Sequence, residues 1–491
     1  MRILLVPLDE RPVSARLPHL VAAIAGAEVI GPPAAALPSV RRSGDLELLS
    51  SWFRNAAADA DGVVLSLEGL GFGGLIPSRI GDEPIEDVLA RWSVLRGLAI
   101  PVHASVVVPR APDALDAFEE PEYWATWGPM LHALSARMAG GGRADAAEPV
   151  PADIRTDWLR RRLRQHALGL AALGMAADGR ISRLFMGVDD AAIPSLSALA
   201  QADLVAWTTR LELHDRVVVG PGADETGAVL TARLLVDRLA PDARPRVAIA
   251  CADPEGLERV APYETWPVES TARAQVEAAG GVLVDDPADA DAVLVVHAPD
   301  GSSADWAVAL PTDTDAAAAR RTAQFAWQLL DAGRAVAVAD VAQPNGADPA
   351  LVRELAAAGA FGRLDGYAAW NTAGNTLGTA AAHLVTAVVA RHRGVFDAAA
   401  GTRLVRLRLI EDFGYMSVAR AALRRDLGSP VDRHDRIGDP DAASAFVADR
   451  IDEALASVPG LEMGPVRPEH VRFPWNRSFE IALADAAGER P

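Results

Sequence analysis

RLFMGVDDAA, residues 183–192, is the stretch from which we infer the fold. Its apolar part, Leu184–Val188, has the length of one buried strand, and Asp189 and Asp190 follow directly. In α/β proteins, ligands and catalytic side chains lie at the carboxyl ends of strands. Because consecutive side chains of a strand point to opposite faces, both carboxylates reach one ligand only if the chain turns there. A proline shortly afterwards favours such a turn; alternatively, Asp190 caps the next helix and Asp189 is solvated.

Apolar strands alternate with helical segments on both sides of this stretch, which indicates parallel sheet. The candidate strands are residues 3–8, 28–31, 62–67, 102–108, 184–188, 216–220, 246–251, 281–284, 292–297, 335–341 and 364–370. We expect an α/β protein with a (β/α)8-like, TIM-type barrel, a small α/β insertion and a helical C-terminal region. Because there are more candidate strands than such a barrel needs, several Rossmann-like parallel-sheet domains are the alternative.

The expected domain organisation follows from these strands. Residues 1–240 form the first part of the barrel, and residues 241–310 form the small α/β insertion or a second domain. Residues 311–400 complete the barrel, and residues 401–491 form the C-terminal region.

Polar side chains follow many of these strands, often beside glycine. Since the carboxyl ends of parallel strands share one edge, this recurrence predicts one shared site. The candidate catalytic residues are Asp189 and Asp190. The candidate substrate-binding residues are Asp9, Arg11, Glu68, Arg79, Asp224, Glu225, Asp340, Asn345, Trp370, Asn371, Asn375, Trp475 and Asn476.

The chemistry of this set suggests a sugar ligand. Carboxylates and amides hydrogen-bond to hydroxyls, and aromatic rings stack on the apolar face of a sugar. Trp370-Asn371 and Trp475-Asn476 supply both kinds of group in adjacent positions, although each tryptophan taken singly is more often a core anchor with its N–H satisfied. When two carboxylates share a site, one of them can stay protonated near neutral pH and act as an acid.

No cofactor is expected under this interpretation. A divalent metal belongs to the alternative, in which Asp9, Asp189, Asp190, Asp224 and Glu225 offer hard oxygen ligands to Mg²⁺ or Mn²⁺. The histidines do not have the spacing of a zinc site.

Composition narrows the class of protein. The chain of 491 residues has a net charge of -19, which argues against a general binder of nucleic acid or anionic membranes. It contains no lysine, which excludes a Schiff-base lysine and a Walker A loop. Its single cysteine, Cys251, closes an apolar strand and is expected to be a buried small side chain. Without a signal peptide or a membrane span in the sequence, we expect a cytoplasmic protein whose partner is a small carbohydrate, and a homo-oligomer is compatible with this.

Eight motifs distributed over nearly the whole chain resemble one bacterial family, the domain of unknown function 4127. These are PLDERPVS (7–14), GGLIPSR (73–79), the VDDAA stretch, PGADETG (221–227), QPNGAD (343–348), YAAWNTAGNTLG (367–378), EDFGY (411–415) and FPWNRSFE (473–480). The family usually has Pro-Tyr-Gly after the paired aspartates, where this chain has Ala192-Ile193-Pro194. The resemblance implies a family but no chemistry.

A second resemblance concerns chemistry. The Asp189-Asp190 pair and the later Tyr367…Trp370-Asn371 are similar in kind and order to motifs of family 84 glycoside hydrolases. That resemblance implies that Asp189 polarises the 2-acetamido group of the substrate, that Asp190 is the general acid/base and that Asn371 binds the sugar. Substrate-assisted hydrolysis of this kind departs from the usual two-carboxylate scheme.

We therefore expect an enzyme, a glycosidase that is retaining and exo-acting on a small glycoside such as an N-acetylhexosaminide. The first alternative is a Mg²⁺- or Mn²⁺-dependent enzyme acting on sugar phosphates or polyols, with Arg11 and Arg79 as anion clamps. The second alternative is a sugar-binding protein without catalysis.

Overall fold

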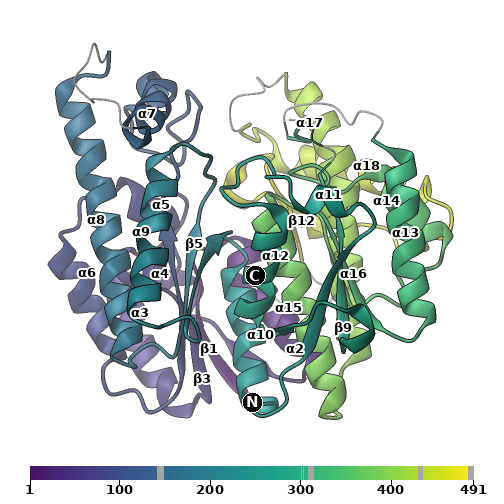
Figure 1. The fold of residues 1–491 in the computed structure, drawn as a ribbon. Helices are drawn as coiled ribbons and strands as arrows, with labels where there is room; N and C mark the ends of the chain where they lie inside the picture. The colour runs from purple at the N-terminus through teal and green to yellow at the C-terminus, as the bar shows by residue number, and fades with distance from the viewer. Residues whose placement is uncertain (141–148, 300, 302–303, 308–313, 429–434, 485–491) are drawn as a thin grey trace. The chain divides into compact units, whose positions relative to one another are not determined.

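Figure 1 shows the fold as a computed structural model that describes residues 1–140, 149–299, 301, 304–307, 314–428 and 435–484. The chain divides into two compact units. Unit 1 comprises Met1–Pro18, Ala27–Leu234 and Tyr263–Thr265, and unit 2 comprises His19–Gly26, Leu235–Pro262 and Trp266–Pro491. Each unit is organised around its own parallel sheet.

The sheet of unit 1 has six parallel strands in the order β2-β1-β3-β4-β5-β6. Their bounds are β1 Arg2–Val6, β2 Glu28–Ile30, β3 Gly62–Ser66, β4 Val102–Val108, β5 Arg183–Val188 and β6 Val217–Pro221. From β1 the chain first adds a strand on one side and then continues on the other. The order therefore reverses between β1 and β3, and such a switch point is where open α/β sheets bind ligands.

Alternate residues of these strands enter one buried cluster, as the pleat of a strand requires. On β4, Val102, Ala104, Val106 and Val108 belong to this cluster, and the residues between them are also buried. Helices on one side of the sheet contribute the rest of the cluster (Figure 1). They are α3 Leu46–Ala56, α4 Leu67–Phe72, α6 Ile85–Trp92, α8 Ala152–Ala177 and α9 Leu196–Arg210. Both faces of β4 are therefore buried, although the second face carries the polar side chains of His103 and Ser105.

Unit 2 contains five parallel strands in the order β11-β10-β9-β7-β8. The strands are β7 Arg246–Cys251, β8 Val282–Leu283, β9 Ala292–His297, β10 Ala335–Asp340 and β11 Gly366–Ala368. Here the order reverses between β7 and β9. Residues 241–310, which we expected as a small insertion or a second domain, supply three strands of this one sheet.

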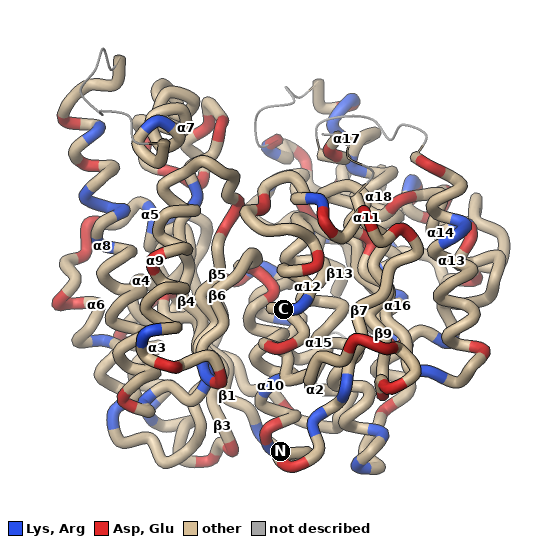
Figure 2. Tube along the Cα trace, viewed as in Figure 1, with Lys and Arg blue, Asp and Glu red and all other residues tan. Residues whose placement is uncertain are grey.

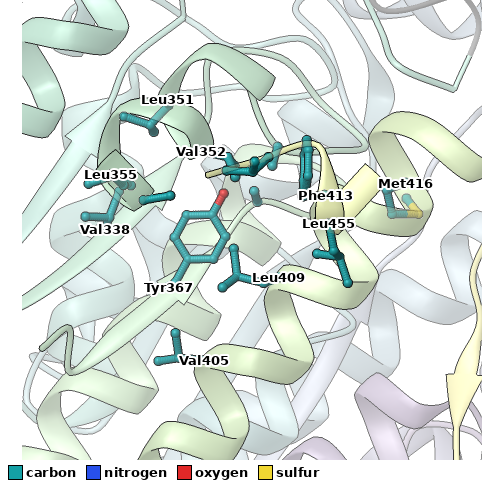
Figure 3. Close-up of a cluster of buried hydrophobic side chains, with 14 of the residues drawn as sticks. Val338, Leu351, Val352, Leu355, Tyr367, Val405, Leu409, Phe413, Met416 and Leu455 are labelled. Carbon is teal, nitrogen blue, oxygen red and sulfur yellow. The ribbon is translucent and has the colours of Figure 1, made fainter. Parts of the chain in front are cut away.

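The helices of unit 2 are amphipathic or wholly buried. They include α12 Val268–Ala279, α13 Ala316–Asp331, α14 Pro349–Ala357, α15 Ala373–His392, α16 Ala398–Arg408, α17 Arg420–Leu427 and α18 Pro440–Ala456, with a π-helix, η5, over Leu409–Ala419. Figure 3 shows part of the core, where Tyr367 of β11 lies among Val338, Leu355 and Leu409. The core of unit 2 therefore joins the sheet to the C-terminal helices.

The structure supports the α/β class with parallel sheets, but the expected TIM-type barrel is not shown. Within the described residues, the first strand of neither sheet pairs with the last. The arrangement is that of the alternative, more than one parallel-sheet unit. None of the described helices combines the length and the apolar character needed to cross a membrane.

Candidate functional site

The chain turns immediately after β5, as the paired aspartates require if they are to meet. The backbone N–H of Asp189 still donates to the carbonyl of Val108 at 3.1 Å. Asp190 then adopts φ +28°, in the left-handed region that non-glycine residues rarely occupy. The next helix, α9, is capped by Ser195, whose hydroxyl accepts from the N–H of Ala198 at 3.1 Å. Asp190 is therefore not the cap of that helix, and its unusual backbone is a feature often found at functional sites.

Both aspartates join one ion cluster at the carboxyl end of the sheet. Arg79, on α5 (Leu75–Ile80), donates to Asp189 and, through Nη1, to Glu119 at 3.1 Å. Arg110, just after β4, donates from Nη1 to Asp190 at 3.0 Å. The two guanidiniums also share the carboxylates of Glu119 and Glu120. With four carboxylates around two arginines, the cluster carries an excess of negative charge.

Burial, together with this excess charge, raises the pKa of one carboxyl group toward neutral pH. Burial and the neighbouring charge of Asp189 raise the pKa of Asp190 to about 7, against the lowering effect of Arg110. Burial also raises the pKa of Glu120. The side chain of Asp190 is 29% exposed, whereas those of Arg79, Glu119 and Glu120 are at most 7% exposed. Asp190 is therefore the member of the cluster that combines a proton to give with access to a ligand.

Three further predicted residues meet at the same edge of the sheet. Arg11 donates from Nε and Nη2 to Asp9 at 3.0 and 2.7 Å, and from Nη2 to Asp224 at 2.6 Å. Asp9 follows β1 and Asp224 follows β6, so this guanidinium links segments that follow two strands far apart in the strand order. We call Arg11 and its two carboxylate partners, Asp9 and Asp224, the Arg11 clamp. The charge of Asp224 is one of the causes that raise the pKa of Asp190, so the Arg11 clamp lies near the ion cluster.

Glu68 lies beside the reversal point of the sheet, on α4. The glycine-rich stretch after β3 forms the short helices α4 and α5. The carboxylate of Glu68 accepts from the N–H of Val107 at 2.8 Å and from the hydroxyl of Ser66 at 3.1 Å. Burial raises its pKa to about 7. Glu225, at the start of α10 (Thr226–Leu239), is fully buried.

The other predicted residues belong to unit 2, and most are engaged in holding local structure. Asp340 accepts from the N–H of Asp348 at 2.6 Å, and burial raises its pKa to about 7. Asn345 donates to Asp305 at 2.9 Å, and its own N–H donates to the carbonyl of Asn371 at 2.7 Å. Asn375 donates to the hydroxyl of Thr372 at 3.0 Å, beside the start of α15.

The two tryptophans proposed as sugar platforms are both buried. Trp370 is 4% exposed, and its indole N–H donates to the hydroxyl of Thr379 at 3.3 Å. Trp475 is 9% exposed, and the guanidinium of Arg477 lies 4.4 Å from its ring centroid. Asn476 donates to the carbonyl of Ile437 at 2.9 Å. These contacts match the core-anchor interpretation of the tryptophans.

Several residues that complete these clusters were not among the predicted ones. Glu119 and Glu120 lie outside any strand–helix boundary, so no pattern in the sequence marks them. His297 and Asp348 follow the signal used elsewhere, because His297 ends strand β9 and Asp348 lies in the quoted QPNGAD motif. In the part of the chain that the structure describes, no group of three or more His, Cys, Asp or Glu side chains is arranged as a metal site.

Comparison with known proteins yields a family but no activity. A family model described as "Protein of unknown function (DUF4127)" matches residues 3–484. Neither a curated protein nor a solved structure matches the chain.

Proposed function

This chain belongs to the DUF4127 family, which has no assigned function, and from the ion cluster of unit 1 we propose that it is a glycoside hydrolase with Asp190 as its general acid/base. The observation that carries the proposal is the environment of Asp190. Its carboxyl group has a pKa raised to about 7 and is partly exposed, and Arg110 fixes one of its oxygens. A group that titrates near the working pH can both donate and recover a proton.

The neighbouring carboxylate gives the pair two different roles. Asp189 is bound by Arg79 and is less exposed than Asp190, at 11% against 29%. A carboxylate held in this way suits the stabilisation of positive charge that develops on the substrate. A carboxyl group that titrates near neutral pH beside a second carboxyl group held by an arginine suits a division into acid/base and charge-stabilising roles.

The finer proposal is a retaining, substrate-assisted N-acetylhexosaminidase, which rests on the resemblance of the Asp-Asp pair to family 84. In the first step, the acetamido oxygen of the substrate bonds to the anomeric carbon and Asp189 polarises the acetamido group. The bond to the leaving group breaks as its oxygen takes the proton of Asp190. In the second step, Asp190 accepts a proton from water, whose oxygen attacks the anomeric carbon. The bond between that carbon and the acetamido oxygen breaks, which opens the oxazoline ring formed in the first step and restores the acetamido group.

The experiment is turnover of a panel of aryl glycosides, including the N-acetylglucosaminide and the N-acetylgalactosaminide, with and without EDTA. We expect the full chain to hydrolyse at least one of them in a chelator-insensitive reaction. Asp190→Asn should lower kcat by about 10²–10⁴-fold, the usual contribution of a general acid/base. The loss should be larger for a phenyl than for a 4-nitrophenyl leaving group, because the poorer leaving group needs the proton more.

The matched control is Asp178→Asn, which removes an exposed aspartate of unit 1 that pairs with Arg180 on the surface. This variant should keep full turnover. The proposal is wrong if no glycoside of the panel is turned over, or if Asp190→Asn retains the activity of the control.

A further inference from the structure

Unit 2 contains a cavity of about 150 Å³ at the carboxyl end of its sheet. Its wall includes Cys251, the last residue of β7, and His297, the last residue of β9. These are the two neighbouring strands between which the strand order reverses. The cavity therefore lies at the topological switch point, the position where open α/β sheets receive their ligands.

His297, one of the lining residues, is a hydrogen-bonded histidine. His297 Nε2 lies 3.0 Å from Asp348, and Nδ1 lies 3.0 Å from the hydroxyl of Thr322. The hydrogen bond from His297 lowers the pKa of Asp348, so this carboxylate is ionised and Nε2 is the donor. With both ring nitrogens engaged, the imidazole has a fixed orientation. A lining polar group with a fixed orientation is a feature of binding sites that are already formed.

The carboxylates in the wall are occupied by the protein itself. Asp348 also binds the hydroxyl of Thr314 and the N–H of Ala350. Asp315 caps α13 by accepting from two backbone N–H groups, and Asp253 lies 3.5 Å from Arg259. Asp315 and Asp348 are thus bound by internal hydrogen-bond donors, whereas Asp253 pairs with Arg259. A ligand in this cavity would compete with Asp253 for Arg259 and would also meet Arg321.

Two arginines reach this cavity from different elements. Arg259 follows α11 (Pro254–Leu257) and donates from Nη1 to the carbonyl of Pro299 at 2.6 Å. Arg321 lies in the second turn of α13, where it is exposed. Acidic and basic positions are interspersed over both units (Figure 2), so the position of these arginines beside a cavity is what distinguishes them.

We propose that this cavity binds the phosphate group of a small phosphorylated molecule, with Arg259 and Arg321 as its cationic contacts. Guanidinium groups recognise phosphate through paired N–H donors. A tetrahedral phosphate presents oxygens in several directions and can meet arginines that come from two elements, whereas a carboxylate presents two oxygens in one plane. The site is separate from the ion cluster of unit 1 and does not depend on the function proposed for it.

The test uses inorganic phosphate and the full chain in isothermal titration calorimetry at constant ionic strength, with acetate as the second anion. We expect saturable binding of one phosphate and no saturable binding of acetate. Arg321→Gln should weaken phosphate binding at least about tenfold, as expected for loss of one charge-assisted contact. The matched control is Arg320→Gln, because Arg320 precedes Arg321 on the same helix but pairs with Glu354 on the surface.

The single cysteine of the chain can report whether phosphate binds at this cavity. Cys251 lines the cavity and is half-buried, so alkylation by iodoacetamide reports on this place alone. Phosphate should slow the alkylation of Cys251 in the parent protein and in Arg320→Gln, but not in Arg321→Gln. Absence of phosphate binding, equal weakening by both substitutions, or binding that leaves Cys251 unprotected overturns the proposal.

Discussion

Arg110 donates from Nη1 to a carboxylate oxygen of Asp190 at 3.0 Å, while its other nitrogens bind Glu119 and Glu120. Burial and the charge of Asp189 raise the pKa of Asp190, whereas the positive charge of Arg110 lowers it. The resulting pKa is about 7. This balance sets the pH range in which Asp190 carries the proton needed for acid catalysis.

The first prediction concerns the pH profile of turnover under the proposed function. Activity that requires protonated Asp190 falls as the pH rises through about 7. Arg110→Gln removes a charge that lowers this pKa, so the alkaline limb of kcat/KM should move to higher pH by roughly one unit or more. Arg96→Gln, a change at an exposed arginine of unit 1, should leave the limb in place. A limb that stays fixed or moves to lower pH in Arg110→Gln contradicts the assignment.

The second prediction concerns the clamp around Arg11. Arg11 is 4% exposed and binds Asp9 and Asp224, so Arg11→Ala leaves two buried carboxylates without their common cation. We expect the free energy of unfolding in urea to fall by about 3–5 kcal/mol. Arg2→Ala, which breaks the exposed pair with Glu28, should cost about 0–1 kcal/mol.

Neutralising the whole clamp separates charge from packing. A triple variant, Arg11→Met with Asp9→Asn and Asp224→Asn, should recover much of the stability lost in Arg11→Ala. If the triple variant is no more stable than Arg11→Ala, the loss came from packing and the electrostatic account of the clamp is wrong.

The fold was predictable where it depends on local pattern. The apolar run Leu184–Val188 is a strand, and the alternation of strands and helices correctly indicated parallel sheet. The grouping of Asp189 with Arg79, and of Asp9 with Asp224, follows from the same rule that strand ends share an edge. Closure into a barrel was not predictable in this way, because it depends on whether the first and last strands pair, and no local pattern encodes that.

The composition of the site was predictable only in part. Glu119 and Glu120 become part of it because two arginines from other elements reach them, which is a consequence of tertiary packing. For the same reason, a sequence cannot distinguish a tryptophan that stacks on a ligand from one that packs in the core. Trp370 and Trp475 are both buried, with their polar or cationic contacts inside the protein.

The third prediction concerns the pH dependence of stability through Glu68. Burial raises the pKa of Glu68 from 4.5 to about 7 in the folded chain. The folded state therefore binds this proton more tightly than the unfolded state, so the contribution is complete below about pH 4.5 and is lost as the pH rises to about 7. Relative to Glu68→Gln, the parent protein should lose up to about 3 kcal/mol over that interval.

Urea unfolding of both proteins between about pH 4.5 and about pH 8 measures this difference. Glutamine keeps an oxygen that accepts from the N–H of Val107, and its NH2 group can donate to the hydroxyl of Ser66, which donates to Glu68 in the parent protein. The substitution therefore removes the titration and retains a partner at both positions. A difference between the two proteins that does not change with pH would falsify the assignment of the raised pKa to Glu68.

The fourth prediction compares two tyrosines that are both fully buried in unit 2. Tyr367 lies among apolar side chains (Figure 3), and its hydroxyl has no hydrogen-bond partner within the residues that the structure describes. Tyr415 instead donates to the carbonyl of Ser478 at 2.6 Å.

Tyr415→Phe should lower the free energy of unfolding by about 1–2 kcal/mol, because it removes this bond and leaves a buried carbonyl with one partner fewer. Tyr367→Phe should leave stability unchanged or raise it by about 1 kcal/mol, since it removes only an unpaired hydroxyl. Thermal unfolding of the two variants checks the contrast, and a loss in Tyr367→Phe as large as that in Tyr415→Phe shows that the hydroxyl of Tyr367 has a partner, such as a buried water.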